Sequence, residues 1–172
     1  MILAGLIHAD HASALIFDMH NEYGIDSISS DNGASVPGLK GKFGGKVKLV
    51  GLGASTNFGK VNADFTLEIA HSDITQEDIL LVSSGLNLKE TTATTLAHLE
   101  QDFGVNWFTK FMEMTSGKTE EGEDGKRVPS PDSVAFWANA AGVNVLAAES
   151  LRSKLDRLNH KDYLVEKPAS KG

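Results

Sequence analysis

The hydrophobic pattern near the start of the chain predicts a helix end followed by a buried strand. Residues 13–17, Ser-Ala-Leu-Ile-Phe, form a short apolar run that is closed by Asp18. An unbroken apolar run of this length is typical of a strand covered on both faces in a parallel sheet. Residues 2–8 have the pattern of the end of a helix, with 8–12 as a connector. This order of elements predicts an α/β layer.

A second pattern follows a stretch rich in Gly, Ser, Asp and Asn that covers residues 26–45. Apolar and polar residues alternate with a period of two in 46–50 and again in 64–69, so each segment can bury one face and expose the other. Glycines at 51, 53 and 59 mark the turn region between the two segments. We therefore expect a strand pair over 46–69.

Helical signals dominate the rest of the chain. Thr75 and Asp78 have the spacing of a capping box, and Ile74 can pack onto Ile79 as a hydrophobic staple, so a helix is predicted here, ending at Gly85. Further helices are predicted over 90–102, 105–114, 131–141 and 144–158.

Two segments of this region do not have a helical pattern. Residues 116–130 are too polar to bury and are bracketed by glycine and proline, which predicts a mobile surface loop. The tail, 166–172, is expected to be frayed.

Composition narrows the class of protein. The 172 residues are 41% hydrophobic and 23% charged, as in soluble globular proteins, and no apolar run approaches the roughly 20 residues that cross a bilayer. The absence of cysteine excludes a disulfide framework and a thiolate metal site. The first nine residues lack the basic segment of a secretory signal. We expect a cytoplasmic protein that does not contact membranes.

The net charge of -7 argues against binding of a phosphate backbone through the overall field. A local basic patch could still form from Lys40, Lys42, Lys46, Lys48 and Lys60. Because lysines commonly protect strand edges, a solvated hairpin rim is the more consistent interpretation of this group.

Ionisable residues that suit catalysis are concentrated near the start. Asp18 ends the predicted strand, and Glu22 follows four residues later, across a turn. Ligands of open α/β sheets bind at the carboxyl ends of strands, where one carboxylate can bind Mg²⁺ through water and another can orient an attacking water. A strand-ending Asp with a nearby Glu also commonly caps a turn. Both interpretations remain open from these residues alone.

A metal site is an alternative at the same end of the chain. His8, Asp10, His11 and Asp18 are residue types that bind transition metals, which would suit a metal-dependent hydrolase. Histidines scattered through a connector are more often only solvated.

Residues 14–24, Ala-Leu-Ile-Phe-Asp-Met-His-Asn-Glu-Tyr-Gly, resemble a family signature. HerA-type P-loop ATPases of the HerA/FtsK superfamily have a hydrophobic strand and an Asp-Pro-His-Gly-Glu-Tyr motif one strand after the P-loop. The four signature residues that agree are Asp18, His20, Glu22 and Tyr23. Met19 replaces the proline and Asn21 the glycine, and Asn tolerates positive φ better than most residues.

The resemblance implies a fold and a division of the chain. The fold would be α/β, a partial P-loop NTPase (RecA-like) with one parallel-sheet strand, a strand pair and a mostly helical insertion. Residues 1–70 would form the partial ATPase core, with the site strand at 14–18 and the pair at 46–69. Residues 71–165 would form the helical insertion.

The resemblance also implies a chemistry. In the complete protein the cofactors would be ATP and Mg²⁺, with Asp18 holding Mg²⁺ or its water and Glu22 positioning the hydrolytic water. His20 would contact the phosphate or only hydrogen-bond its own loop, and Tyr23 would pack the turn. The complete protein would be a DNA translocase or helicase that assembles into a homo-oligomeric ring, with a nuclease as a further partner.

A P-loop itself is not evident. It requires Gly-x-x-x-x-Gly-Lys-Ser/Thr between a strand and a helix, so that backbone amides cradle phosphate. Ser116–Thr119 has the ending, but Met112 stands where the first glycine belongs. Residues 53–60 have five residues between glycines, followed by Val61. We interpret both as imitations and expect an interior fragment that does not turn over ATP, with its P-loop upstream and the Walker B acid and arginine finger beyond Gly172.

A non-catalytic interaction module is the alternative from another class of function. In that case the helices over 75–158 would dock a partner through an exposed apolar seam at Leu151, Leu155 and Leu158.

Overall fold

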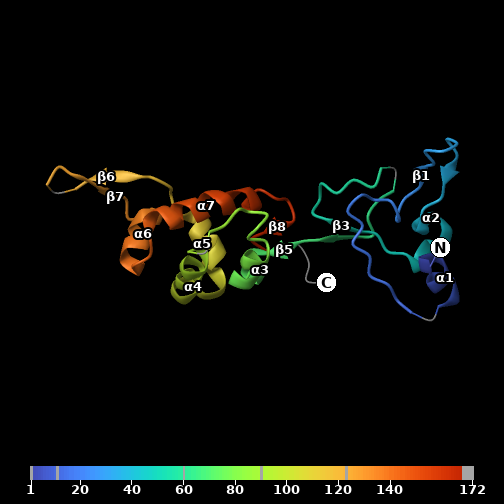
Figure 1. The fold of residues 1–172 in the computed structure, drawn as a ribbon, viewed down its shortest axis with the longest axis horizontal. Helices are drawn as coiled ribbons and strands as arrows, with labels where there is room; N and C mark the ends of the chain where they lie inside the picture. Colours follow the sequence, from blue (N-terminus) through green and yellow to red (C-terminus); the bar gives the residue numbers. More distant parts are fainter. Residues whose placement is uncertain (1, 11, 60, 90, 123, 168–172) are drawn as a thin grey trace. The chain divides into compact units, whose positions relative to one another are not determined.

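A computed structural model describes residues 2–10, 12–59, 61–89, 91–122 and 124–167. The chain is a mixed α/β protein that divides into two compact units, Met1–Leu67 and Glu68–Gly172. Within the described residues the strands form four two-stranded sheets, two of them parallel. Helices are sparse in the first unit and dominate the second (Figure 1).

The first unit begins with the predicted helix, α1 (Ile2–Ala9). The elements that follow are β1 (Ser27–Ile28), β2 (Ser35–Val36), α2 (Leu39–Phe43), the 3-10 turn η1 (Gly44–Lys46), β3 (Val50–Leu52) and β4 (Phe65–Leu67). Strands β1 and β2 pair as an antiparallel hairpin. Two hydrophobic side chains near this strand pair are buried: Leu49, directly before β3, and Phe58, in the connection between β3 and β4.

A strand pair lies within the expected range 46–69, and it is parallel, but its first strand is displaced: β3 overlaps the expected strand 46–50 only at Val50 and includes Gly51, which was expected in the turn. Val50 pairs with Phe65, and Leu52 with Leu67. A tight turn cannot join parallel strands, so residues 53–64 form a crossover connection. Both strands are shorter than the alternating pattern predicts.

The expected site strand at 14–18 is not a strand in this structure. Residues 12–17 have no assigned strand, and Leu15 and Phe17 are 84% and 88% exposed. A buried parallel strand requires neighbours to hydrogen-bond and to cover it, and none of the described strands pairs with this segment. The prediction of burial for 13–17 is therefore wrong for the chain as described.

The second unit contains the predicted helices, in the predicted order. They are α3 (Gln76–Leu81), α4 (Thr92–Phe103), α5 (Trp107–Glu113), α6 (Val134–Ala141) and α7 (Val145–Asn159), with 3-10 turns η2 (His71–Asp73) and η3 (Gly104–Asn106). The capping box predicted at Thr75 and Asp78 is formed, with both of its hydrogen bonds. A parallel pair of β5 (Ile69–Ala70) with β8 (Leu164–Val165) joins the two ends of the unit.

The second unit holds the main hydrophobic core. The largest fully buried side chains are Trp107, Phe108, Phe111, Leu96, Leu99, Leu151 and Leu155. Leu158 packs against the same cluster. The seam of α7 that an interaction module would expose is thus buried within its own unit, because α7 packs on α4, α5 and α6. An exposed docking seam at these leucines is therefore wrong.

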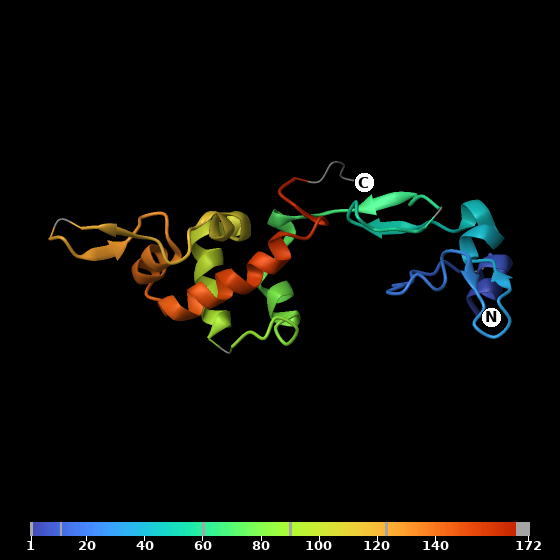
Figure 2. The same ribbon diagram turned by 90° about the horizontal axis from the view of Figure 1, so that it is seen from above.

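The predicted surface loop over 116–130 contains a hairpin. Its strands are β6 (Thr119–Glu121) and β7 (Arg127–Pro129), paired antiparallel, and it extends away from α6 (Figures 1 and 2). Gly125, at a φ of 74°, lies in the turn and donates a hydrogen bond to the carbonyl of Gly122. Strand β6 is exposed, as predicted for this segment, but Ser130 at the end of the segment is buried.

The expected frayed tail begins at Glu166, and its last part, 168–172, lies outside the described residues. No helix within the described ranges is both long enough and apolar enough to cross a membrane.

Candidate active site

The turn after residue 17 is organised by one carboxylate. Asp18 accepts hydrogen bonds from the backbone amide of Glu22 at 3.0 Å, from that of Tyr23 at 2.9 Å and from that of Gly24 at 3.4 Å. A short acidic side chain that accepts from amides a few residues later fixes a turn, as an Asx turn does. The turn-capping role that the sequence left open is therefore present.

These hydrogen bonds also control the ionisation of Asp18. Partial burial raises the pKa of its carboxyl group, but the backbone hydrogen bonds from Tyr23, Glu22, Gly24 and His20 outweigh burial and leave the pKa below its ordinary value. Hydrogen bonds to the charged form favour that form. Asp18 is consequently an anion at neutral pH.

The turn depends on a left-handed residue at Asn21. Its φ is 55°, which is the conformation that a glycine would adopt easily and that Asn tolerates better than most residues. The substitution of Asn for the expected glycine is thus accommodated. The Asn21 side-chain amide also donates to the carbonyl of Asn57 at 3.3 Å, which ties the turn to the β3–β4 connection.

The end of the turn rests on α2. The carbonyl oxygens of Tyr23 and Gly24 accept hydrogen bonds from the amides of Leu39 and Lys40 at 2.8 and 3.1 Å. Gly38 makes this approach feasible, since a Cβ there would lie 2.3 Å from the Ile25 carbonyl carbon. The start of α2 therefore supports the turn.

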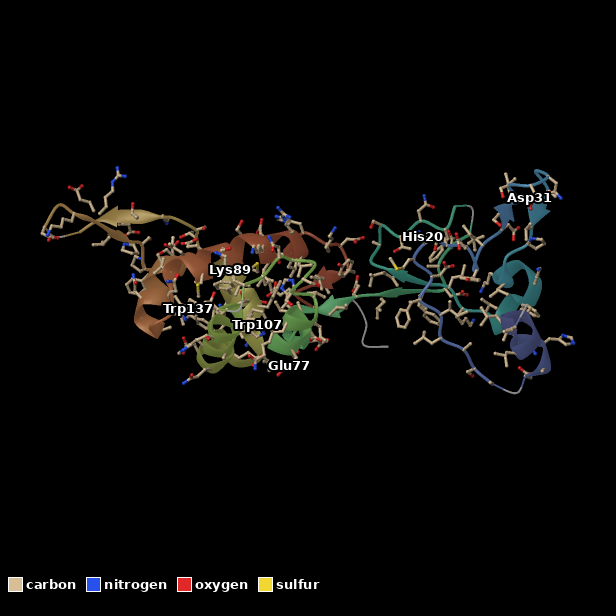
Figure 3. All side chains as sticks on the ribbon, viewed as in Figure 1. His20, Asp31, Glu77, Lys89, Trp107 and Trp137 are labelled. Atoms are coloured by element: carbon tan, nitrogen blue, oxygen red, sulfur yellow. The ribbon has the colours of Figure 1, made fainter. Side chains whose placement is uncertain are left out.

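The remaining signature residues lie on the outside of this turn. The side chains of His20 and Glu22 are exposed, and His20 is labelled in Figure 3. The Glu22 carboxylate has no hydrogen-bond or ion-pair partner among the residues that the structure describes. Asp18 and Glu22 thus share one turn, where Asp18 is the structural acceptor and Glu22 is displayed to solvent.

A second acidic centre, at Asp64, was not predicted. Lys40 Nζ lies 2.8 and 2.7 Å from the two carboxylate oxygens of Asp64 and 2.8 Å from the carbonyl oxygen of Val47. Asp64 also accepts from the Leu49 amide at 2.7 Å. The hydrogen bonds from Lys40 and Leu49 lower the pKa of Asp64. No local pattern in the sequence indicates that residues 24 positions apart would pair.

Most lysines of the expected basic patch are paired with acidic side chains. Lys46 pairs with Asp10 at 3.1 Å, and Lys48 lies 4.0 Å from Asp64, so most of the expected basic patch is matched by acids. Lys60 lies outside the described residues. Within the described residues Lys40, Lys46 and Lys48 therefore connect parts of the first unit through ion pairs, which agrees with a structural role for them.

The alternative metal site has no support in the geometry. Among the described residues, no group of three or more His, Asp or Glu side chains could hold a metal ion. Asp10 is engaged by Lys46, and His11 lies outside the described residues. The set His8, Asp10, His11 and Asp18 is not brought together in the part that is described.

The two segments that imitate a P-loop are each followed by a strand, whereas a P-loop is followed by a helix. Thr119, which would follow the lysine of a P-loop, begins strand β6 and not a helix. The glycines at 53 and 59 lie in the crossover before β4, where no helix follows. Neither segment has the strand, loop and helix that cradle a phosphate.

The chain matches a known protein family over most of its length. Residues 1–166 match the model of the family described as the central domain of the helicase HerA. No curated protein and no solved structure matches the chain. The matched range includes the Asp18 turn and the helices of the second unit, so parts of both units belong to one family domain.

Proposed function

The chain belongs to the family of the HerA helicase central domain, and we propose that it contributes the acidic turn of a magnesium-nucleotide site in an ATP-hydrolysing DNA translocase. The family is one of ATPases of the translocase type. The turn from Asp18 to Gly24 is the part of the chain whose geometry supports this proposal most directly.

The observation that carries the proposal is that the two acids of this turn have different environments. Three backbone amides hold Asp18, while the carboxylate of Glu22 faces solvent with no partner among the described residues. An unpaired carboxylate on a fixed turn is suited to orient a water molecule for attack on a phosphate.

The donor set also fits magnesium. Mg²⁺ prefers oxygen ligands and keeps several of its waters, so it is commonly held through one or two carboxylates. Asp18 is ionised, as a carboxylate that holds Mg²⁺ or one of its waters must be. In the complete protein Asp18 would hold Mg²⁺ through one of its waters, and the metal would supply positive charge against the phosphates. His20 would donate to a phosphate oxygen.

We propose in addition that residues 14–17 become a strand of a RecA-like parallel sheet in the complete protein. Leu15 and Phe17 are almost fully exposed, and the segment pairs with no described strand. Exposed apolar side chains on an extended, unpaired segment are costly in water, so further sheet strands would stabilise it. The partners implied by the family, namely DNA, copies of the chain in a ring and a nuclease, belong to the same proposal.

The test is Glu22→Gln in the complete polypeptide encoded by the reading frame. Loss of a positioned base or water-orienting group lowers turnover by about a hundredfold or more, while nucleotide affinity is unchanged because the phosphate contacts remain. Steady-state ATP hydrolysis and equilibrium nucleotide binding measure the two quantities. Asp31→Asn, on the turn between β1 and β2, is the matched control with the same loss of charge. Unchanged turnover in Glu22→Gln would refute the assignment.

A further inference from the structure

The Asp18 turn ends at Gly24, where two other segments of the first unit contact it. The carbonyl oxygen of Gly24 accepts a hydrogen bond from the backbone amide of Lys40, in α2, at 3.1 Å. A Cβ at Gly24 would lie 2.7 Å from the Cδ2 atom of Leu49, so the side chain of Leu49 packs directly against the Gly24 backbone. Leu49 is buried and lies directly before β3. The end of the turn therefore contacts both α2 and the segment before β3.

Asp64 binds both of the residues that contact Gly24. Its two carboxylate oxygens lie 2.8 and 2.7 Å from Lys40 Nζ, and the second also accepts a hydrogen bond from the Leu49 amide at 2.7 Å. The Asp64 amide donates to the Leu49 carbonyl at 2.8 Å. One carboxylate, directly before β4, thus holds together the two supports of the turn.

The pair of Lys40 with Asp64 is more sheltered than a surface ion pair. Both side chains are 22% exposed, whereas those of the Lys46–Asp10 pair are 47% and 76% exposed. Lys40 Nζ also donates to the carbonyl of Val47 at 2.8 Å, so the ammonium group is held on two sides. Exposed ion pairs contribute little, and charge-assisted hydrogen bonds with several good contacts are stronger. Of these two pairs, that of Lys40 with Asp64 is the stronger constraint.

A path of contacts leads from this pair to Glu22. The Gly24 amide donates to the Asp18 carboxylate at 3.4 Å, and the Glu22 amide donates to the same carboxylate at 3.0 Å. A displacement of Gly24 would therefore disturb the acceptor that fixes the backbone of Glu22. A misplacement of about 1 Å in a reacting group can lower its rate by about a hundredfold.

We propose that Asp64 is a positioning residue for Glu22. Through Lys40 and Leu49 it fixes the end of the turn, and thereby the place at which the Glu22 carboxylate meets its water. The inference rests on the proposed function, because it gives Asp64 a part in the same reaction. Asp64 acts through the two residues that it binds and does not itself contact the nucleotide.

The first measurement uses the chain itself and needs no nucleotide. Asp64→Asn removes the negative charge that holds Lys40 and keeps the size of the side chain. Amide hydrogen exchange at Tyr23 and Gly24 is expected to accelerate about fivefold, because a charge-assisted contact that supports the turn is lost. Asp31→Asn, whose carboxylate accepts no hydrogen bond from the described residues, should leave these rates unchanged. Equal rates in Asp64→Asn and the parent chain would overturn the proposal.

The second measurement is ATP turnover of the complete polypeptide encoded by the reading frame. Asp64→Asn is expected to lower kcat about tenfold and to leave nucleotide affinity unchanged, since the group that orients the water is displaced and the phosphate contacts remain. Lys40→Met should lower kcat to a similar extent. Lys40→Arg, which keeps the ion pair, should retain most of the turnover.

A double variant separates positioning from general support of the fold. In the Glu22→Gln background, Asp64→Asn should cause no further loss of turnover, because residues that act as one unit are not additive. A further tenfold loss there would overturn the proposal. Turnover of Asp64→Asn equal to that of Asp31→Asn would also overturn it and would leave the proposed function standing, provided that Glu22→Gln is inactive. If Glu22→Gln keeps full turnover, the proposed function fails and this inference fails with it.

Discussion

The carboxylate of Asp18 accepts a hydrogen bond from the amide of Tyr23, five residues along the chain, at 2.9 Å. This contact and its neighbours close the turn that displays Glu22. The acid that the family signature places first is thus a positioning residue in this structure, whatever it binds in addition. The second acid is the one free to act on a ligand.

The first prediction concerns this turn. Asp18→Ala removes the acceptor of three amides and, by analogy with the loss of a helix cap, should cost about 1 kcal/mol locally. That corresponds to about a fivefold increase in amide hydrogen exchange at residues 22–24. Hydrogen exchange followed by mass spectrometry or NMR measures the exchange rates of these amides. Asp31→Ala is the control, because its carboxylate accepts no hydrogen bond from the described residues. Equal protection in both variants would contradict the role given to Asp18.

The second prediction is a two-stage loss of stability in acid. Burial lowers the pKa of His71 below 6.5, more strongly than Glu166 raises it, so its contribution is present above about pH 6.5 and is lost as the pH falls further. The His71 ring nitrogen Nε2 is buried without a partner, which disfavours its protonation. Hydrogen bonds also lower the pKa of Asp18, Asp64 and Asp78, so their contributions are lost only below about pH 3.8.

Tryptophan fluorescence in urea titrations at several pH values measures the first stage, because Trp107 and Trp137 both lie in the unit that contains His71. His71→Gln should remove the loss of stability that begins as the pH falls below about 6.5 and leave the loss below about pH 3.8. If this variant lost as much stability in the first stage as the parent chain, another group would be responsible.

The third prediction tests the close approach at Gly38. An alanine Cβ would lie 2.3 Å from the Ile25 carbonyl carbon and 2.7 Å from the Gly24 oxygen, and both are backbone atoms that cannot turn away. Gly38→Ala should therefore destabilise the first unit by about 1–3 kcal/mol, the usual cost of forced overpacking. Gly45→Ala is the matched control, since no atom lies within 4 Å of its Cβ. Proteolysis within residues 20–45 under native conditions is expected to accelerate for Gly38→Ala alone.

The fourth prediction separates a core helix from a docking helix. Leu155 is fully buried, so Leu155→Ala should cost about 2–5 kcal/mol in urea unfolding followed by tryptophan fluorescence. Leu146, on the same helix, is 80% exposed, and Leu146→Ala should cost less than about 0.5 kcal/mol. Similar small losses for both would revive the interaction-module interpretation of α7.

Features that depend on contacts within a few residues of chain could be predicted from the sequence. Thr75 and Asp78 form their capping box within one turn of chain, and Gly104 follows α4 at a φ of 56°. Asn21 adopts the positive φ that its residue type tolerates. The acids of the candidate site were found in the same way, because Asp18 and Glu22 lie four residues apart in a recognisable signature.

Features that depend on residues far apart in the sequence could not be predicted. The ion pair of Lys40 with Asp64 and the parallel pairing of β5 with β8 join residues that no local pattern connects. The same limit explains the error at 13–17. An apolar run indicates that a segment would be stabilised by burial, but only neighbouring strands can bury it. None of the described strands pairs with the segment that contains Leu15, which is 84% exposed.

The sequence by itself therefore determined the positions of the helices, the caps at Thr75 and Gly104 and the turn at Asp18, because each depends on contacts within a few residues of chain. The residue types of the 14–24 signature indicated the family. The tertiary structure decided which way the strands run, which leucines are covered and which of the two acids faces solvent. Those outcomes depend on chain segments meeting across long separations, where loop closure and packing, and not residue type, set the free energy.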